Sequence, residues 1–346
     1  MVESTKVLLI TGFLGSGKTT FLNRIIENFP KDLKLTILMN EFGEIGIDGT
    51  LVEGDDIDMM EISRGSIFCV CVKTDFIKGL YELNSKIQPD LLIIESTGVA
   101  NPSDLKRDLK LPIFNGRFEF TDQFCIIDAA HFLEAFDIFA SVEKQLATST
   151  VFIINKTDLV EKNVVEEIKQ IVRKNNPEPL FFETTFSNIP LESFSFLGGK
   201  TTGSSSVEQT QAPSPVLPPK ELDNFIDNLL KQPGQEMSPP DQLASVTYSW
   251  HGDDADEIKA MASELPSSIV RAKGFIFDKD EVYLFSYVMG DWTFEPIKKD
   301  PSKIQHPNMV VFIGGVDSMD GVAKAVAKGK WSAREVLMPA LQTDIL

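Results

Sequence analysis

The sequence has few cysteines and no long apolar run. These two features argue against a disulfide-rich secreted domain and against a membrane-spanning protein. Its three cysteines, at positions 69, 71 and 125, are too few for the disulfide framework of a secreted domain, so we expect reduced thiols. No apolar stretch approaches the ~18 residues that a membrane-spanning helix needs. The apolar run over residues 7–10 is too short for a signal peptide and leads directly into a glycine-rich loop. These features predict a cytoplasmic protein.

Basic residues are also scarce. Lysine and arginine total 33 against 51 aspartates and glutamates, which gives a net charge of −18. A charge of this sign repels nucleic-acid backbones and anionic lipid surfaces, so neither nucleic acid nor a membrane is an expected partner. The apolar content of 42% is ordinary for a globular chain. The 346 residues are too many for one simple core and predict two domains.

What the sequence does contain, near its start, is a glycine-rich phosphate loop. Residues 12–19 fit the pattern G-x-x-x-x-G-K-[ST], with a buried strand expected before them and an amphipathic helix after them. The glycines allow a tight turn that directs several backbone N–H groups at one anion, and the helix adds the positive end of its dipole. We expect Lys18 to contact the β- and γ-phosphates and the Thr19 hydroxyl to bind Mg²⁺. The predicted nucleotide contacts of this loop are Gly12, Gly15, Ser16, Gly17, Lys18, Thr19 and Thr20.

The spacing of apolar residues predicts an α/β fold of the P-loop NTPase type, with a doubly wound, mostly parallel sheet. Short apolar runs are typical of buried strands, and one-sided apolar patterns are typical of helices. We expect strands over residues 6–11, 33–39, 90–94, 124–127, 151–154 and 180–183. Helices are expected after the phosphate loop and over residues 74–86 and 164–174. In such a sheet, ligands bind at the carboxyl ends of the strands.

Acidic residues follow two of these strands. Glu41 and Asp48 lie in a glycine-containing loop after the second strand, within reach of a metal ion, although the same pattern fits a solvated loop. Glu95 closes the strand over 90–94, and Gly98 follows three residues later. We expect Glu95 to orient Mg²⁺ or water and the Gly98 N–H to approach the γ-phosphate; the alternative is a strand-capping turn. The predicted catalytic groups are therefore Lys18, Glu95 and Gly98, and the predicted Mg²⁺ ligands are Thr19, Asp48 and Glu95.

A later strand leads into a signature for base recognition. Asn155, Lys156, Thr157 and Asp158 form N-K-x-D directly after the strand over 151–154. The Asp158 carboxylate can accept hydrogen bonds from the N1–H and the exocyclic amine of guanine, whereas adenine has no such pair of donors. After a phosphate loop and an acidic strand end, the motif predicts GTP rather than ATP. Asn155, Lys156 and Asp158 are its predicted nucleotide contacts.

Two of the cysteines stand two residues apart. If the chain is extended there, Cys69 and Cys71 point to the same face, and two thiolates can share one soft metal ion where the backbone bends between them. Two ligands do not complete a tetrahedral site. The other interpretation, which the spacing alone favours, is a pair of buried small side chains in an apolar strand.

The composition changes after residue 198. Glycine, serine, threonine and proline are frequent in 199–242, which predicts a flexible linker interrupted by one short amphipathic helix around 221–230. The predicted domains are thus a P-loop domain over 1–198, the linker over 199–242 and a second domain over 243–346. The second domain has the strand and helix patterns of a small α+β unit, and we expect His251 and His306 at its surface.

Together, these motifs make the chain similar to a known family. Residues 11–20, the N-E-F-G segment at 40–43, residues 95–102 and residues 155–159 resemble the CobW-like GTPases, relatives of the UreG and HypB metal-insertion GTPases. Residues 271–275 resemble the start of the family's C-terminal domain. The resemblance implies a GTP-hydrolysing metallochaperone whose metal site is a C-x-C-C motif assisted by the glutamate of N-E-F-G. The corresponding residues are Glu41, Cys69 and Cys71, and Val72 stands where the third thiol is expected.

The leading hypothesis is a GTPase that loads a metalloprotein, using GTP and Mg²⁺ and carrying Zn²⁺ or Co²⁺ on Glu41, Cys69 and Cys71. The alternative is a nucleotide-gated factor that remodels a cobalamin (corrinoid)-dependent enzyme and binds no metal itself, which the missing third thiol favours. A small-molecule kinase is disfavoured, because N-K-x-D occupies a strand end and no basic lid is evident. The expected partners are guanine nucleotide and a client metalloprotein or corrinoid protein, and a nucleotide-dependent homodimer is a candidate assembly.

Overall fold

The computed structural model describes residues 4–40, 58–62, 70–96, 102–194, 218–230, 243–278, 281–298, 301, 304 and 306–337. These residues form two compact units, one within residues 4–230 and one within residues 243–337. No helix in these ranges is long and apolar enough to cross a membrane.

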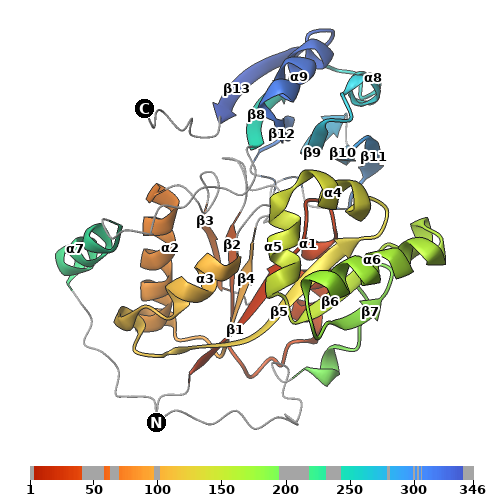
Figure 1. Ribbon diagram of the computed structural model, residues 1–346. Helices are drawn as coiled ribbons and strands as arrows, with labels where there is room; N and C mark the ends of the chain where they lie inside the picture. Colours follow the sequence, from red (N-terminus) through yellow and green to blue (C-terminus); the bar gives the residue numbers. More distant parts are fainter. Residues whose placement is uncertain are drawn as a thin grey trace, which may run out of the picture. The chain divides into compact units, whose positions relative to one another are not determined.

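The first unit is built on a seven-stranded parallel sheet with the order β3-β2-β4-β1-β5-β6-β7 (Figure 1). β1 lies between β4 and β5, so the chain extends the sheet on one side of β1 before it extends the other. The carboxyl end of β1 is therefore the switch point at which such sheets bind ligands. The strands are β1 (Thr5–Thr11), β2 (Leu35–Asn40), β3 (Asp58–Ile62), β4 (Leu91–Glu95), β5 (Phe118–Asp128), β6 (Val151–Asn155) and β7 (Leu180–Glu183).

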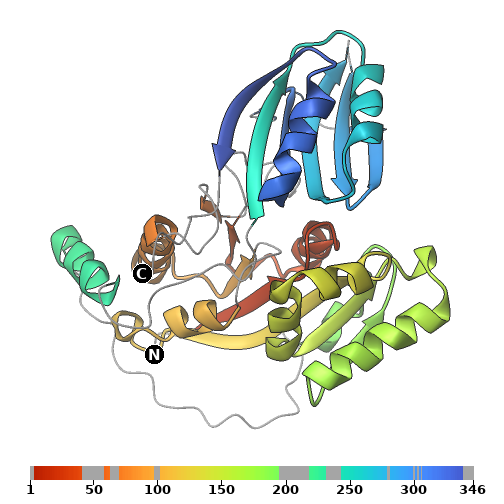
Figure 2. The same ribbon diagram turned by 45° about the horizontal axis from the view of Figure 1, so that its top comes forward.

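Helices cover both faces of this sheet, because its central strands are apolar on both sides. Leu8 and Ile10 of β1 pack with α1 on one face, whereas Val7 and Leu9 pack with α2 and α3 on the other. Figures 1 and 2 show α1 and α3 on opposite sides of the strands. The helices are α1 (Lys18–Asn28), α2 (Val70–Glu82), α3 (Pro102–Leu109), α4 (Phe132–Ile138), α5 (Ala140–Thr148) and α6 (Lys162–Asn175). The doubly wound α/β fold predicted from the sequence is confirmed.

The start of α2 differs from the expected structure. The helix begins at Val70 rather than at residue 74, so Cys71 lies in its first turn and the interpretation of an extended strand is wrong there. Cys69 lies outside the described residues. Local β-branched residues favour a strand, but Phe76, Ile77 and Leu80 form a buried stripe, and extending an existing helix adds one hydrogen bond per residue. At its other end the helix widens into a π-turn, Leu83–Ile87, instead of continuing as α-helix to residue 86.

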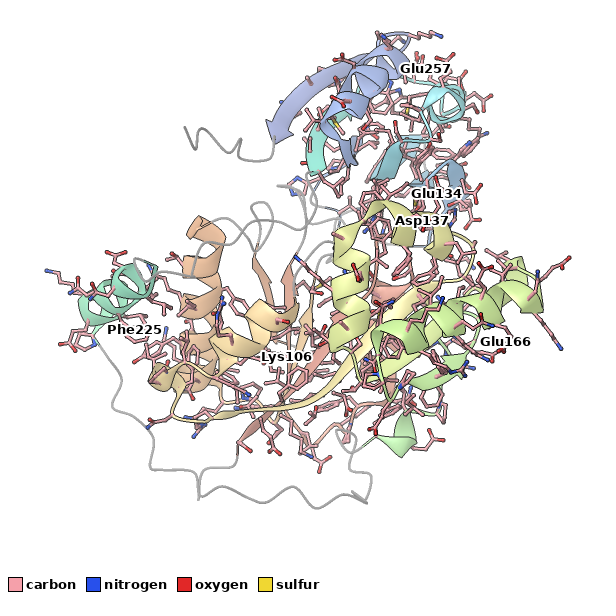
Figure 3. The ribbon with its side chains drawn as sticks, in the orientation of Figure 1. Lys106, Glu134, Asp137, Glu166, Phe225 and Glu257 are labelled. Carbon is pink, nitrogen blue, oxygen red and sulfur yellow. The ribbon has the colours of Figure 1, made fainter. Side chains whose placement is uncertain are left out.

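One further helix belongs to the first unit. α7 (Pro219–Leu230) lies inside the segment for which a linker is predicted, and it packs against α2. Ile226 and Leu229 are 1% and 6% exposed within the same apolar cluster as the α2 stripe, and Phe225, labelled in Figure 3, is partly buried beside them. Asp223 forms an ion pair of 2.7 Å with Lys78 of α2. The flanking residues 195–217 and 231–242 lie outside the described ranges.

The second unit is an antiparallel sheet with the order β11-β10-β9-β12-β8-β13. Two helices, α8 (Asp256–Glu264) and α9 (Met319–Val326), pack with Trp250, Phe285 and Phe312 in one core, which confirms the predicted α+β architecture. His251 is exposed, as expected, and contacts the Ser332 hydroxyl at 2.8 Å. The strands are β8 (Leu243–Trp250), β9 (Ile269–Asp278), β10 (Glu281–Val288), β11 (Asp291–Pro296), β12 (Met309–Gly315) and β13 (Trp331–Leu337).

Candidate nucleotide site

The phosphate loop lies between β1 and α1, as its flanking sequence predicts. Gly12, Gly15 and Gly17 all have positive φ angles, of 135°, 79° and 107°, which side chains other than glycine rarely adopt. A Cβ atom at Gly12 would collide with the backbone oxygen of Ile126. Gly17 immediately precedes the first helical residue, Lys18, so the loop ends where the helix presents its free N–H groups.

The side chains of this loop fit a bound anion. Lys18 is only 6% exposed, and its ammonium donates to the carbonyl oxygens of Gly12 and Phe13 at 3.0 and 3.2 Å. The Ser16 hydroxyl is buried without a hydrogen-bond partner among the residues described. A buried hydroxyl and a buried ammonium in one glycine cradle are donors suited to phosphate oxygens. Thr19 and Thr20 follow in the first turn of α1, where both are at least partly exposed.

Glu95 lies beside this loop, as its place at a strand end predicts. It is the last residue of β4, and the sheet register pairs it with Ile10 near the end of β1. The residue is 5% exposed. The next residue, Ser96, donates its backbone N–H to the Ile10 carbonyl at 3.0 Å, which ties the two strand ends together. Gly98 lies outside the described residues, so its predicted role stays a prediction.

Asn155 joins the phosphate loop to two other segments. This last residue of β6 is 3% exposed, and its side-chain amide donates to the Ser16 carbonyl at 2.9 Å. Its amide oxygen accepts from the Ser187 N–H at 2.9 Å. The Ser187 hydroxyl in turn donates to the Gly17 carbonyl at 3.3 Å. Asn155 thus supports the shape of the loop through protein contacts, and a direct nucleotide contact from it stays a prediction.

The N-K-x-D segment continues after Asn155 into a turn over residues 156–159, which we call the base turn. Lys156 has a left-handed backbone with φ 59°, and residues Thr157–Leu159 form one 3₁₀ turn. Asp158 is exposed, which is compatible with the predicted base contact, and that contact stays a prediction. The Lys156 ammonium contacts Asp128, the last residue of β5, at 2.6 Å. Asp128 is a site residue that the sequence alone does not single out.

The loop after β7 is a second part of the site that the motifs do not indicate. Both the N–H and the hydroxyl of Thr157 donate to the Thr184 carbonyl, at 3.3 and 3.2 Å. Arg24 of α1 donates to the Phe186 carbonyl at 2.7 Å. Phe186 and Ser187 are both left-handed, with φ 51° and 53°, and the Phe186 side chain is 71% exposed. The sequence signal that could have indicated this loop is its position after β7, because it leaves the sheet at the same edge as the other segments of the site.

The predicted transition-metal site falls largely outside the described residues. Glu41, Asp48 and Cys69 lie there, and only the backbone of Cys71 is described. Within the described ranges, no three His, Cys, Asp or Glu side chains gather as a metal site would require. The third cysteine, Cys125, is 2% exposed in β5, and burial raises its pKa to about 12. Its thiol therefore stays protonated at neutral pH and does not replace the missing ligand.

The strand–loop–helix cradle, the acidic strand end and the base turn at one sheet edge define a phosphate-loop nucleotide-binding protein. The family model described as "CobW/HypB/UreG, nucleotide-binding domain" matches residues 6–183. A second model, for the C-terminal domain of the cobalamin synthesis protein cobW, matches residues 244–328. The chain therefore belongs to the CobW/HypB/UreG family, and the resemblance drawn from its motifs is confirmed.

Several curated relatives are similar over part of the chain. The protein named "Zinc chaperone YeiR" of Escherichia coli (strain K12) is 36% identical over 157 residues, which cover 44% of this chain and 47% of YeiR. "Zinc-regulated GTPase metalloprotein activator 1" of Dictyostelium discoideum is 27% identical over 229 residues, covering 55% of this chain and 48% of that protein. The chain thus spans about half the length of these relatives. The crystal structure of the Zn(II)-bound YjiA GTPase from E. coli is 19% identical and covers 94% of this chain and 99% of its own, with a TM-score of 0.43.

Proposed function

We propose that this protein binds GTP with Mg²⁺, hydrolyses it to GDP and phosphate, and uses this cycle to deliver a metal ion to a client protein. The observation that carries the proposal is the shared contact network of Asn155, which holds the phosphate loop, the base turn and the loop after β7 together. This network supports the proposal because it brings the phosphate loop and the turn predicted to bind guanine together.

Each predicted residue has a chemical task in this proposal. Lys18 and the loop N–H groups stabilise the negative charge of the β- and γ-phosphates, while Glu95 and Gly98 orient the attacking water and the γ-phosphate. The water forms a bond to the γ-phosphorus as the bond from phosphorus to the β–γ bridging oxygen breaks, so GDP leaves with that oxygen and a proton of the water passes to the phosphate product or to solvent. The oxygen donors Thr19, Asp48 and Glu95 suit Mg²⁺, which when bound would offset the charge of the phosphates.

The base assignment has a direct test. Asp158→Asn replaces one acceptor of the carboxylate by a donor, so we expect guanine nucleotides to bind less tightly and xanthine nucleotides more tightly. Titration calorimetry with GDP, XDP and ADP measures this shift. Asp137→Asn, which changes an exposed carboxylate of α4 (Figure 3), is the control and should leave all three affinities unchanged. Equal affinity of the wild-type protein for GDP and ADP would contradict guanine recognition.

The metal cargo is proposed from the thiols and from the relatives. Both curated relatives carry zinc in their names, and Cys69, Cys71 and Glu41 stand where the family motif has its ligands. Two thiolates leave a soft ion such as Zn²⁺ or Co²⁺ accessible to exchange, which suits a carrier that releases its cargo to a client metalloprotein. Because such thiols need to stay reduced, we propose a cytoplasmic location. We also propose a nucleotide-dependent homodimer as the working form.

Metal titration decides between the two candidate functions. We expect the wild-type protein to bind one Zn²⁺ or Co²⁺ more tightly than the Cys69→Ser/Cys71→Ser double variant, with an affinity that differs between GDP and a non-hydrolysable GTP analogue. Cys125→Ala is the matched control, because this buried thiol should not contribute. If wild type and double variant bind equally in both nucleotide states, the metal role fails, and the metal-free remodelling of a corrinoid-dependent enzyme becomes the better description.

A further inference from the structure

A carboxylate outside the predicted motifs holds the lysine of the base turn. Asp128 ends β5, and the sheet register places it opposite Asn155, the residue before Lys156. One of its oxygens, Oδ2, accepts from the Lys156 ammonium at 2.6 Å. We infer that Asp128 is the positioning residue of the base turn and that, through Lys156, it sets how tightly and how selectively guanine is bound. This inference rests on the proposed GTP binding.

Contacts other than the one with Lys156 also orient the Asp128 carboxylate. Its Oδ1 accepts from the Ala130 N–H at 3.0 Å, and His131 Nδ1 contacts Oδ2 at 3.1 Å. The Ala129 N–H donates to the Asn155 carbonyl at 3.0 Å, so the backbone after β5 is also tied to the backbone after β6. With Asp128 only 5% exposed and Lys156 29% exposed, the lysine reaches from solvent toward a buried, preoriented anion.

We expect Asp128 to carry its charge at neutral pH. Burial alone would raise the pKa of this carboxyl group, but the hydrogen bond with His131 and the charge of Lys156 together lower its pKa below the usual value. A charged acceptor makes the contact with Lys156 strong, and its loss would leave an ammonium without a fixed partner on this side.

The backbone explains why this contact matters for base recognition. Lys156 occupies a left-handed conformation that a lysine adopts at some cost, and Asp158 follows only two residues later. Thr157 is held on the other side by the Thr184 carbonyl. The Asp128 contact and the Thr184 contact therefore fix two consecutive residues at the start of the turn that carries Asp158. Without the Asp128 contact, Lys156 can relax and carry Asp158 away from the base.

The test measures base affinity separately from phosphate affinity. For Asp128→Asn we expect the GDP dissociation constant to rise about tenfold, the loss of one charge-assisted contact, and the preference for GDP over ADP to fall. The affinity for magnesium pyrophosphate, which lacks a base, should not change. Asp122→Asn, six residues earlier on β5, is the matched control and should bind GDP as the wild type does.

A double variant shows whether Asp128 acts through Lys156. On the Lys156→Met background, Asp128→Asn should change GDP affinity by less than about twofold, because the contact is already lost. If Asp128→Asn does not fold, Asp128→Glu is the alternative variant. It keeps the charge but displaces the ammonium by one methylene, so it should still weaken the binding of GDP and leave the binding of magnesium pyrophosphate unchanged. Unchanged GDP affinity in the Asp128 variants, or additive losses in the double variant, overturn the inference while the proposed function stands. A wild-type protein without preference for GDP over ADP overturns both.

Discussion

Asn155 shows how one side chain can organise a binding site. Its amide donates to one backbone segment and accepts from another, and the hydroxyl of its second partner, Ser187, closes the connection to Gly17. A Cβ atom at Gly17 would lie only 2.5 Å from the Asn155 amide nitrogen, so the contact also explains why glycine is needed there. Contacts within the protein thus hold the loop in the shape described above.

At the residue scale, the first prediction concerns Lys18. Lys18→Ala should weaken GTP binding by about 1.5–3 kcal/mol, the value of a hydrogen bond to a charged group, if the ammonium donates to phosphate as we propose. The midpoint of urea unfolding without nucleotide should change little in comparison. Titration of both proteins with GTP and GDP measures the effect, and an unaltered dissociation constant would contradict the phosphate site.

A second residue-scale prediction concerns Phe186. Its exposed ring is carried by a loop that contacts α1, the base turn and the phosphate loop, so we expect it to pack against the bound base. Phe186→Ala should weaken GDP binding by about 1 kcal/mol, as for other aromatic contacts, and leave stability nearly unchanged. Leu180→Ala, at an exposed position that begins β7, is the control. Equal GDP affinities of both variants and wild type would exclude the ring from the site.

The sequence could predict the residues that belong to a contiguous pattern. It could not predict the residues that reach the site only because the chain folds. The sequence indicates Lys18 and Glu95 as candidates because a loop pattern and a strand end carry their own signal. Asp128 also ends a strand, but neither it nor Ser187 belongs to a phosphate-loop or base motif, and each acts through a partner about 30 residues away along the chain. Such contacts depend on strand order, which periodicity does not encode.

At the scale of elements, α2 and α7 show the same limit. The sequence predicts α2 but starts it four residues too late, because local β propensity indicates a strand that the packing of the apolar stripe overrides. The helix within the predicted linker was also expected, but not its partner. Its apolar side lies on the first unit, in the cluster that contains Phe76 and Leu80.

The packing of α7 leads to a stability prediction. Leu229→Ala should lower the free energy of unfolding of the first unit by about 2–3 kcal/mol, as expected for a buried leucine. Asp223→Asn, which removes an ion pair with side chains 54% and 43% exposed, should cost less than about 1 kcal/mol. Urea unfolding of the two variants compares them directly. A small effect of both would mean that α7 does not pack against α2 in solution.

At the scale of the whole molecule, the family and both architectures followed from the sequence. The motifs, in their order along the chain, were sufficient for the family, and the alternation of strands and helices was sufficient for the parallel sheet. The sequence was not sufficient to divide residues 199–242 into a packed helix and its flanking stretches. Composition distinguishes a polar stretch from a core, but it does not distinguish a docked helix from a free one.

The segment before α7 provides the last prediction. Removing ten residues within 199–217 should leave the melting temperature and GTP affinity unchanged, because the deletion ends before the packed helix. Deletion of 219–230 is the contrasting variant and should lower the melting temperature of the first unit. A large loss of stability from the first deletion would show that the removed residues pack.

The docking of α7 has a consequence for how far the two units can separate. With α7 held on the first unit through Ile226 and Leu229, the connection to β8 is residues 231–242 rather than the whole polar segment. Such a stretch cannot reach beyond about 45 Å, whatever its conformation. If the client of the proposed function binds the second unit, this connection keeps it at an effective concentration of roughly millimolar relative to the first unit. Weak affinity for the client would then be sufficient for repeated encounters within one nucleotide cycle.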